Sequence, residues 1–368
     1  MSLPVYAPAP SPDYGDWRWQ ARHSVRDLPG LEARLRLTDD ERVGVRRALA
    51  GGFPLAITPY YLSLADPEDP ACPIRKQVVP SAREADRVPG DLRDPLGEED
   101  HEVAPELVQR YPDRALLLAS DRCAVYCRFC TRSRMVGDGG GARSLERLAP
   151  AFAYLESHPE VREVIVSGGD PAVMATGRLA RILGRLASIP HLDTVRLATR
   201  APVTIPQRIT VELATMLAGV HPSLWVMTHF NHPKELTEAS TLALRHLTER
   251  GLPVMNQSVL LRGVNDDAAT LEALFRGLVR RRVRPYYLLQ ADVVQGTGHL
   301  RTPLHRGVEL MAALQGRVSG IALPKLIVDT PGGRGKVPLG PATVVRRRGG
   351  ATTLRTFRGE EVDYLDPP

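Results

Sequence analysis

The stretch ALLLASDRCAVYCRFC, residues 115–130, joins a short apolar run to three closely spaced cysteines. The apolar run, residues 115–120, is typical of a strand buried inside a parallel sheet. The cysteines, Cys123, Cys127 and Cys130, are three of the four in the chain. Thiols this close together on one loop suit joint metal binding better than the cross-linking of distant segments, which indicates a reducing, cytoplasmic setting.

The strand pattern repeats along the chain and predicts an α/β fold. Apolar runs typical of buried strands occupy residues 115–120, 163–167, 194–199, 224–228, 253–260 and 285–290. Stretches with helical periodicity follow them at residues 145–157, 178–188, 211–217, 238–250, 268–282 and 306–315. Six β/α units in succession predict a parallel sheet with helices on its outside, either an open sheet or an incomplete barrel.

The segments that flank this series have other patterns. The proline-rich residues 1–16 predict an extended or disordered arm, and residues 17–64 have a helical pattern with a capping box from Thr38 to Glu41. Residues 65–113, rich in proline and aspartate, are expected to be irregular. Strand-like segments near the C-terminus lie at residues 325–329, 343–347 and 352–357. We therefore expect three parts: an N-terminal arm, helical region and connector over 1–113, a β/α core over 114–320, and a short β-rich segment over 321–368.

Composition and charge argue against several classes of function. The chain has 43% hydrophobic and 24% charged residues, as an ordinary globular protein does. Arginine supplies all but four of its 48 basic residues, a bias that we assign to genomic base composition. The basic runs at 280–282 and 346–348 lack interleaved aromatic residues, so we expect solvated faces and no nucleic-acid partner. The sequence has neither a secretory signal nor an apolar run long enough for a membrane helix, which predicts a cytoplasmic protein with no membrane attachment.

The cysteine spacing favours an iron–sulfur cluster over zinc. Three thiolates can hold three irons of a cubane cluster, which leaves the fourth iron without a protein ligand. A structural zinc site is normally closed by four ligands and an electron-transfer cluster needs a fourth cysteine, but Cys72 lies far upstream. The CxxxCxxC pattern after the first strand of a β/α series resembles the radical S-adenosylmethionine (SAM) superfamily, in which SAM chelates the open iron through its amino and carboxylate groups. Zinc or a plain cluster is the alternative on this motif alone.

Polar motifs collect at the carboxyl ends of the predicted strands, where parallel β/α folds bind their ligands. They are Ser167-Gly168-Gly169-Asp170, Thr199-Arg200, His229 with Asn231 and His232, Gln257 inside the fifth strand, and Gln290 with Asp292. Structural polar residues would occur at both ends, so this one-sidedness predicts a single active site. The Ser-Gly-Gly-Asp motif resembles the glycine-rich motif that binds the amino group of SAM; a helix-entry turn capped by Asp170 is the alternative.

A second distinctive segment is DTPGGRGKVP, residues 329–338. It is not a phosphate-binding P-loop, because Thr330 and Val337 stand where that motif needs Gly and Ser or Thr. In a chain with so few lysines, Lys336 indicates a need for an amine, which can form a Schiff base as arginine cannot. A Schiff base with pyridoxal phosphate and an ordinary loop lysine both remain open on these residues.

Together these motifs resemble the lysine 2,3-aminomutases, radical enzymes that use SAM and pyridoxal phosphate. The matching segments are residues 110–114, 123–132, 167–170, 200–203, 206–210, 229–233, 256–266, 284–287, 299–303 and 331–338. Their order and spacing cover residues 100–358. The resemblance implies an incomplete (β/α)6 TIM-like barrel with a helical N-terminal region and a short C-terminal β-rich segment.

The resemblance also implies a role for each matching residue. Cys123, Cys127 and Cys130 would hold the 4Fe–4S cluster, and Lys336 would carry pyridoxal phosphate. Further cofactor-binding positions would be Arg110, Tyr111 and Arg114 for the phosphate, and Ser167, Gly168, Gly169, Asp170, His229 and Gln257. Arg132 would bind the substrate carboxylate, and Asp292 and Asp329 the distal ammonium of lysine. The implied reaction moves the α-amino group of L-lysine to the β-carbon and gives β-lysine.

The resemblance leaves some features of substrate and assembly open. Members with a C-terminal zinc site have a cysteine where this chain has Asp267, so no zinc is expected. Phe129 and Leu289 replace residues that are often histidine and aromatic in the family, so another basic amino acid such as arginine, or β-lysine production for a translation factor, is an alternative. A non-catalytic iron–sulfur or zinc module is a third. The expected partners are a small basic amino acid, an electron donor such as flavodoxin or ferredoxin, and further copies of the chain in a homo-oligomer.

Overall fold

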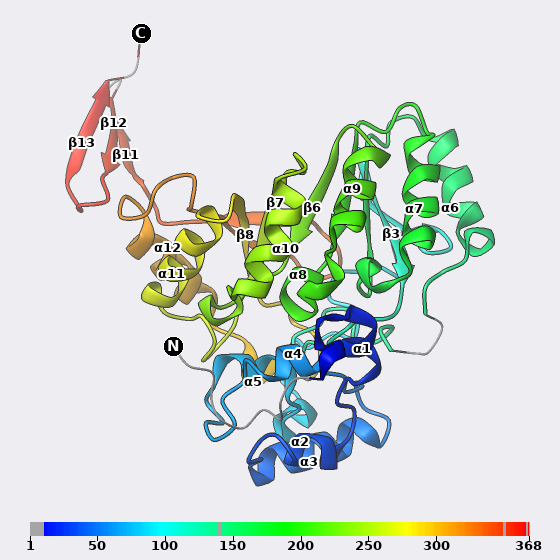
Figure 1. The fold of residues 1–368 in the computed structure, drawn as a ribbon. Coiled ribbons are helices and arrows are strands. Elements are labelled where there is room, and N and C mark those ends of the chain that lie inside the picture. The colour runs from blue at the N-terminus through cyan, green and yellow to red at the C-terminus, as the bar shows by residue number, and fades with distance from the viewer. Residues whose placement is uncertain (1–10, 138–140, 349–350, 366, 368) are drawn as a thin grey trace.

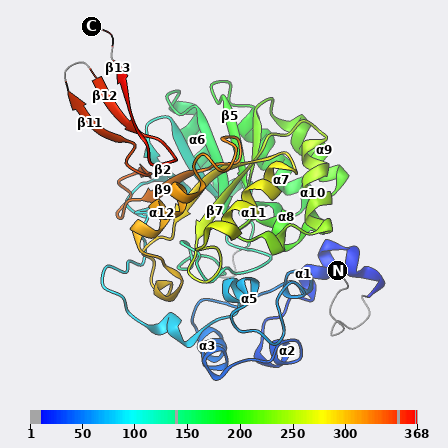
Figure 2. The ribbon, with the colours of Figure 1, turned by 90° about the vertical axis from the view of Figure 1, so that its left-hand side faces the viewer.

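The computed structural model describes residues 11–137, 141–348, 351–365 and 367 of the 368-residue chain. One large sheet forms the centre, helices cover its outer face, and the N-terminal helices lie together at one end of it (Figure 1). A small C-terminal sheet projects from this body, as both Figure 1 and the view turned by 90° in Figure 2 show. The α/β fold expected from the alternating pattern is confirmed.

The large sheet has ten strands in the order of the sequence. Its strands are β1 (Glu102–Ala104), β2 (Leu107–Tyr111), β3 (Arg114–Ser120), β4 (Glu163–Gly168), β5 (Thr194–Ala198), β6 (Leu224–Thr228), β7 (Val254–Leu260), β8 (Val283–Gln290), β9 (Lys325–Asp329) and β10 (Lys336–Leu339). Strands β3 to β9 run parallel, whereas β1, β2 and β10 are antiparallel to their neighbours. Because β1 and β10 are at opposite edges, the sheet is open along one side, as in a partial TIM-like barrel.

Helices connect the parallel strands and cover the sheet. They are α6 (Leu145–Ser157), α7 (Thr176–Ala187), α8 (Ala201–Thr204), α9 (Val211–Val220), α10 (Glu238–Thr248), α11 (Ala268–Val279) and α12 (Leu304–Leu314), with short 3-10 helices η3 (Pro171–Val173), η4 (Pro206–Arg208), η5 (Pro233–Glu235) and η6 (Gly298–Leu300). Leucine and isoleucine on the inner faces of these helices pack against the Val- and Leu-rich strands. The expected strand and helix stretches of the core all have a counterpart here, with ends that differ by a few residues.

The N-terminal region is built from short helices. They are η1 (Pro12–Gly15), α1 (Trp17–Arg22), α2 (Leu28–Glu32), α3 (Asp39–Leu49), α4 (Pro59–Leu62), α5 (Pro73–Val78) and η2 (Ala82–Ala85). The predicted capping box is present, since the Glu41 N–H donates to Thr38 Oγ1 (3.2 Å) and the Thr38 N–H donates to Glu41 (2.7 Å). Residues 1–10 of the expected arm lie outside the described residues, and Pro12–Gly15 is a 3-10 turn rather than extended chain.

One expectation for the flanks needs correction, and one boundary falls inside the large sheet. Residues 65–113 are not irregular throughout, because they contain α5, η2, β1 and β2. The expected domain boundary at 113/114 lies in the turn between β2 and β3, whose residues Tyr111 and Arg114 are paired. The sheet therefore begins before residue 114. These strands were missed because they are short and depend on long-range pairing more than on local preference.

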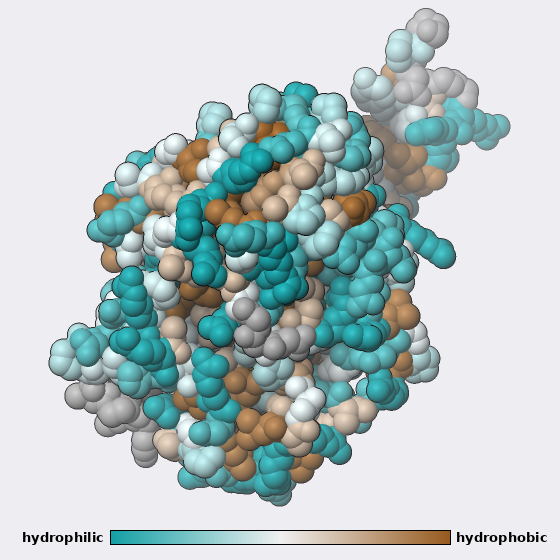
Figure 3. Space-filling view, turned by 90° about the vertical axis from the view of Figure 1, so that its right-hand side faces the viewer, coloured by the Kyte–Doolittle hydropathy of each residue, from teal (hydrophilic) through white to brown (hydrophobic). Residues whose placement is uncertain are grey.

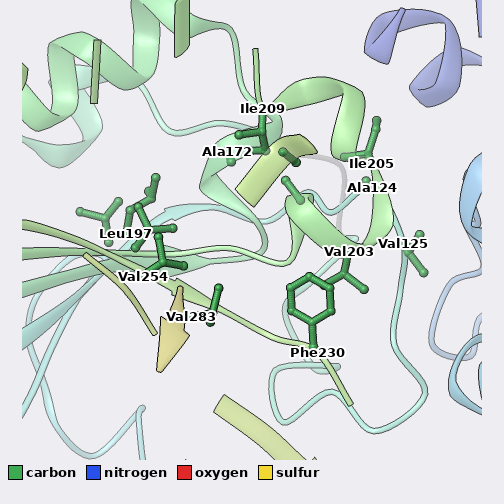
Figure 4. Close-up of a cluster of buried hydrophobic side chains, with 14 of the residues drawn as sticks. Ala124, Val125, Ala172, Leu197, Val203, Ile205, Ile209, Phe230, Val254 and Val283 are labelled. Carbon is green, nitrogen blue, oxygen red and sulfur yellow. The ribbon is translucent and has the colours of Figure 1, made fainter. Parts of the chain in front are cut away.

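The N-terminal region closes the end of the sheet at which the parallel strands terminate. Thr58 Oγ1 donates to the Thr204 carbonyl (2.6 Å), and the Tyr126 N–H of the cysteine loop donates to the Ala56 carbonyl (3.1 Å). Ala124 and Val125, between the cysteines, belong to the same buried apolar cluster as Val203 and Phe230 (Figure 4). The helical N-terminal region therefore packs directly against the cysteine loop and the ends of the parallel strands.

The C-terminal segment forms a second, three-stranded antiparallel sheet. Its strands are β11 (Val344–Arg348), β12 (Ala351–Arg355) and β13 (Glu361–Leu365). One face of the molecule shows hydrophilic and hydrophobic residues intermingled over the body, with this sheet projecting beyond it (Figure 3). Within the described ranges, no helix is both long and apolar enough to cross a bilayer.

Candidate active site

The cysteine loop follows β3 and is fastened to the glycine motif at the end of β4. The Gly169 N–H donates to the Ser120 carbonyl (2.6 Å), and the Asp170 N–H donates to the Arg122 carbonyl (2.7 Å). Gly168 has a φ of +109°, and a Cβ there would lie 2.3 Å from the Ser120 oxygen. A Cβ on Gly169 would lie 2.5 Å from the Arg122 oxygen. The lack of a Cβ at these glycines therefore allows the backbone of the cysteine loop to approach closely. The sequence had indicated close approach of a ligand at this point.

Replacing Gly168 by alanine is expected to damage the cysteine loop. The added Cβ would meet backbone rather than a movable side chain, and φ would be strained, so we expect a loss of about 3 kcal/mol in the free energy of unfolding. Iron content after anaerobic reconstitution should fall with it. Gly177→Ala in α7 is the matched control, because no atom lies within 4 Å of its added Cβ. A Gly168→Ala protein with normal stability and iron content would contradict this account.

The three thiols lie partly covered at the floor of the site. Burial raises the pKa of Cys130 to about 11 and holds that of Cys123 well above its ordinary range, so both are thiols without a metal. In the described part of the chain, no three His, Cys, Asp or Glu side chains are grouped as ligands of a metal ion. In a cubane cluster each thiolate binds a different iron, so the three sulfurs do not need to converge on a single metal ion. The spacing of these cysteines is therefore compatible with a cluster.

Asp170 has the capping role that was the alternative for this motif, and further partners besides. Its carboxylate accepts from the Ala172 N–H (3.0 Å), Thr199 Oγ1 (2.6 Å) and the Arg200 N–H (2.9 Å). Burial raises its pKa, although these hydrogen bonds oppose the shift. Asp170 therefore ties the ends of β4 and β5 together directly above the cysteine loop.

His229, after β6, has a buried ring nitrogen with unused hydrogen-bonding capacity in the part of the chain that the structure describes. Its ring lies 5.5 Å from that of Phe129, which stands between two of the cysteines. Burial, and next the charge of Arg200, lowers the pKa of His229 to about 3, so the imidazole is neutral. Its Nε2 is buried without a hydrogen-bond partner among the described residues. Such an atom costs about 1–3 kcal/mol unless a ligand satisfies it.

Ser167 and Gln257 are at the same end of the sheet. Ser167 is buried one residue before the end of strand β4, and its Oγ lies 3.3 Å from Arg132 Nη1. Gln257 is half-buried on β7, which carries the buried Asn256 beside it. Gln290 at the end of β8 has a buried Oε1 with no partner in the described residues. Polar groups thus lie at this end of the sheet, and at least one of them, Gln290 Oε1, has hydrogen-bonding capacity that the described residues leave unused.

Lys336 lies directly opposite Asp329 in a β-hairpin. Strand β10 begins at Lys336 and pairs with the end of β9, so that Lys336 and Asp329 are register partners. The intervening glycine loop is closed by Thr330 Oγ1, which donates to the Gly335 carbonyl (2.7 Å). The Lys336 ammonium contacts the Asp329 carboxylate, which is 7% exposed. The lysine predicted on a loop is therefore held at the start of a strand.

Asp292 is a second carboxylate near the Lys336–Asp329 ion pair. Burial, and next the negative charge of Asp329, raises the pKa of Asp292 to about 7. Lys336, Arg110 and Arg132 all act on it in the opposite direction, so Asp292 lies within electrostatic range of the Lys336–Asp329 pair. The structure thus brings together all of the residues assigned to the amine, the carboxylate and the reactive lysine.

The three phosphate candidates differ in their distance from Lys336. Arg110 Nη1 lies 3.3 Å from Asp329, and the Tyr111 hydroxyl accepts from the Lys336 N–H (2.9 Å). Arg114 is one step further out, with its guanidinium 3.8 Å above the Tyr111 ring and its Nη1 2.8 Å from Asp113. Arg110 and Tyr111 therefore contact the Lys336–Asp329 pair directly. Arg114 contacts Tyr111 instead, and so lies one residue further from Lys336.

Arg132 is held by a carboxylate that the sequence did not indicate. Both its Nε and its Nη2 lie 2.8 Å from Glu98, which is 3% exposed. Burial would raise the pKa of Glu98, but Arg132 and Arg134 outweigh it and lower the pKa. Glu98 belongs to the connector, which has no periodic pattern to reveal it. Arg132 thus presents mainly its Nη1 towards Ser167 and the site.

Arg200, after β5, is a further site residue that lacked an assigned role. Its Nη1 donates to Cys127 Sγ at 2.6 Å, and its Nη2 lies 2.9 Å from the buried Glu235. Two signals for it exist in the sequence: its position at a strand end among the other polar motifs, and its place in the matching segment 200–203. The residues present fit the groups that the motifs imply: three cysteine thiols, a neutral histidine whose buried Nε2 has no partner among the described residues, and an amine beside an arginine and a tyrosine.

Comparison with known proteins matches two parts of this chain to family models. The model of the radical SAM superfamily matches residues 117–274, and the lysine-2,3-aminomutase model matches residues 311–368. The first spans the cysteine loop and strands β3 to β7, and the second spans the β9–β10 hairpin and the small C-terminal sheet. A radical SAM methyltransferase of Sphaerobacter thermophilus is a structural neighbour at 22% identity and a TM-score of 0.45, covering 60% of this chain and 68% of its own.

Curated relatives match almost the whole chain. The L-lysine 2,3-aminomutase of Clostridium subterminale is 45% identical over 96% of this chain and 85% of its own length. That of Bacillus subtilis is 43% identical over 99% of this chain and 77% of its own. The glutamate 2,3-aminomutase of Clostridioides difficile is 39% identical over 97% of this chain and 84% of its own. The cysteine loop, the Lys336 hairpin and these relatives agree: the chain belongs to the lysine 2,3-aminomutase family of radical SAM enzymes and is an aminomutase.

Proposed function

We propose that this enzyme uses SAM and pyridoxal phosphate to convert L-lysine into β-lysine. The observation that carries the proposal is the pair of buried carboxylates, Asp292 and Asp329, in one site with Lys336 and Arg132. Two carboxylates neutralise and hydrogen-bond a cationic side chain, and an arginine binds the α-carboxylate at the other end. Lysine has the complementary charges.

The protein's own residues would position the reactants. Cys123, Cys127 and Cys130 would hold the 4Fe–4S cluster, and Ser167, Asp170, His229 and Gln257, with the turn of Gly168 and Gly169, would surround SAM. Arg110, Tyr111 and Arg114 would take the phosphate of the pyridoxal group beside Lys336. When bound, the cluster with SAM supplies a carbon radical, and pyridoxal phosphate supplies an imine through which nitrogen migrates.

Glutamate is the rival substrate, because a glutamate 2,3-aminomutase is among the relatives. The side-chain carboxylate of glutamate would meet Asp292 and Asp329, and like charges in a buried site repel strongly. Arginine carries a cationic side chain too, but its guanidinium is larger and planar. β-Lysine production for a translation factor is a further alternative. The branch that this function implies often lacks the Asp292/Asp329 pair, so the presence of both aspartates here favours an enzyme that acts on free lysine.

The test is a substrate comparison on anaerobically reconstituted enzyme. Lysine, arginine and glutamate are each incubated with SAM and a reductant, and products are followed by NMR. We expect β-lysine from lysine and at least about 100-fold lower turnover of glutamate, the effect of about 3 kcal/mol of lost ion pairing. Turnover of arginine without lysine would overturn only the substrate, whereas no amino-group migration with any of them would overturn the function.

Other features belong to the same proposal. The core would be a (β/α)6 unit made of β3 to β8 with their helices, flanked by an N-terminal region over 1–113 and a C-terminal segment over 321–368. A flavodoxin- or ferredoxin-like protein would supply electrons, and the enzyme would work in the cytoplasm as a homo-oligomer without zinc. Its thiols and its radical chemistry favour such a reducing compartment.

A further inference from the structure

A buried guanidinium touches one of the three cluster cysteines. Arg200 follows β5, and its Nη1 donates to Cys127 Sγ at 2.6 Å. Among the described residues, no side chain donates a hydrogen bond to the sulfur of Cys123 or Cys130, although the charge of Arg132 also acts on Cys130. The guanidinium of Arg200, by contrast, places a full positive charge in contact with a cysteine sulfur. In the described part of the chain, Cys127 is therefore the ligand with a charged donor.

The rest of the guanidinium is fixed by residues from three parts of the fold. Its Nη2 lies 2.7 Å from Gln77 Oε1, 2.9 Å from Glu235 Oε1 and 3.1 Å from the Tyr61 hydroxyl, and its Nε donates to the His229 carbonyl (3.2 Å). Tyr61 and Gln77 come from α4 and α5 of the N-terminal region. The arginine therefore cannot swing away from Cys127 without breaking several buried hydrogen bonds.

Glu235 is a fully buried counter-charge to this arginine. Its side chain is 0% exposed and accepts from the Tyr61 hydroxyl (2.6 Å), the Asn231 N–H (2.6 Å) and the His232 N–H (3.0 Å). Burying two charges costs several kcal/mol per ion, and apolar residues would fill the space with less penalty. Such a pair against a cluster ligand therefore needs a reason other than stability.

We propose that Arg200 sets the reduction potential of the cluster, and that Glu235 limits its effect. The inference rests on the proposed function, since it requires the 4Fe–4S cluster. Reduction adds one electron from a low-potential carrier, and a positive charge or hydrogen bond at a ligand sulfur favours the reduced form. Arg200 raises the potential through Cys127, and Glu235 lowers it from the far side of the guanidinium. Tyr61 and Gln77 hold both at a constant distance.

The two charges predict shifts of opposite sign. Arg200→Gln should move the midpoint potential of the cluster to a more negative value, and Glu235→Gln to a less negative value. Arg200→Lys, which keeps the charge, should lie between wild type and Arg200→Gln. The potentials are measured by redox titration followed by electron paramagnetic resonance, on full-length reconstituted protein with SAM absent and no substrate present. This measurement needs no turnover.

Arg75 and Glu41 provide a matched control pair. They too are a buried arginine and glutamate, with Nε to Oε1 at 2.6 Å, but Arg75 hydrogen-bonds Glu41 and the Arg36 and Pro67 carbonyls rather than a cluster cysteine. Arg75→Gln and Glu41→Gln should lower stability and leave the potential of the cluster unchanged. A purely structural role for Arg200 would make its variants behave like these two.

Each outcome decides the proposal. If Arg200→Gln does not retain iron, the Glu235→Gln protein carries the test, and an unchanged or more negative potential there overturns the inference. Equal shifts in the control pair also overturn it. The proposed function fails in a different way, by the absence of a cluster or of lysine turnover in the wild-type enzyme.

Discussion

Replacing Lys336 by alanine is expected to remove both the pyridoxal absorbance band and the aminomutase activity, with turnover lowered by about a thousandfold or more. The reason is geometric as well as chemical. Lys336 starts β10 opposite Asp329, and its N–H donates to Tyr111, so its amine has a fixed place between the acidic pair and the phosphate candidates. No other lysine is available there, since the remaining three are Lys76, Lys234 and Lys325.

Lys325 offers the matched control for this prediction. It begins β9 in the same hairpin but is exposed, and Lys325→Ala should keep both the band and the activity. Lys336→Arg retains the positive charge beside Asp329 and should still lose the band, because a guanidinium does not form the Schiff base. A Lys336→Ala enzyme that binds pyridoxal phosphate as wild type does and turns over lysine would refute the assignment.

The core of this fold could be predicted from the sequence because its signals are local. Val- and Leu-rich runs alternate with helical stretches, and each run became one parallel strand. Parallel strands align their carboxyl ends, so the motifs after β4, β5, β6 and β8 had to lie together. The same argument places the cysteines and Asp292 at the same end of the sheet from the sequence alone.

The residues that were missed depend on distant parts of the chain. Glu98 lies in a connector with no periodic pattern, and its pairing with Arg132 joins positions 34 apart. Tyr61 and Gln77 reach Arg200 from helices of only four and six residues, which propensity predicts poorly. Gly168 and Gly169 lie at the end of β4 as the pattern predicts, but their contact with the cysteine-loop backbone could not be read from the sequence. The sequence thus indicates which polar residues lie at the same end of the sheet. Which side chains they hydrogen-bond can be seen only in the packed structure.

Removing one of the two site carboxylates is the second change with a large expected effect. Asp292→Asn and Asp329→Asn should each lower kcat/KM for lysine by about 10- to 150-fold, the value of one charged hydrogen bond of about 1.5–3 kcal/mol. Asp329→Asn should be the more severe, because Asp329 also contacts Lys336 and lies 3.3 Å from Arg110. Steady-state kinetics by NMR or chromatography measure both.

The kcat/KM for lysine should also depend on pH, and the pKa of Asp292 determines the direction of the change. The pKa of Asp292 is raised to about 7 by burial and by Asp329, so the carboxyl is neutral below that pH and charged above it. The ammonium of lysine stays protonated until about pH 10. The attraction between the two is therefore present above pH 7 and lost below it, and kcat/KM should fall by up to about tenfold per pH unit on the acidic side.

The Asp292→Asn enzyme should lack this acidic limb, because the group that titrates has been replaced by an amide. Asp193→Asn is the control, since Asp193 is exposed and pairs with Arg162 on the surface, away from the charges that act on Asp292. It should reproduce the wild-type profile. If Asp292→Asn lowers kcat/KM but retains the limb near pH 7, another group titrates there and Asp292 contributes only a hydrogen bond. If both aspartate variants bind lysine as wild type does, the distal ammonium does not lie between them, and the case for lysine over glutamate loses its physical basis.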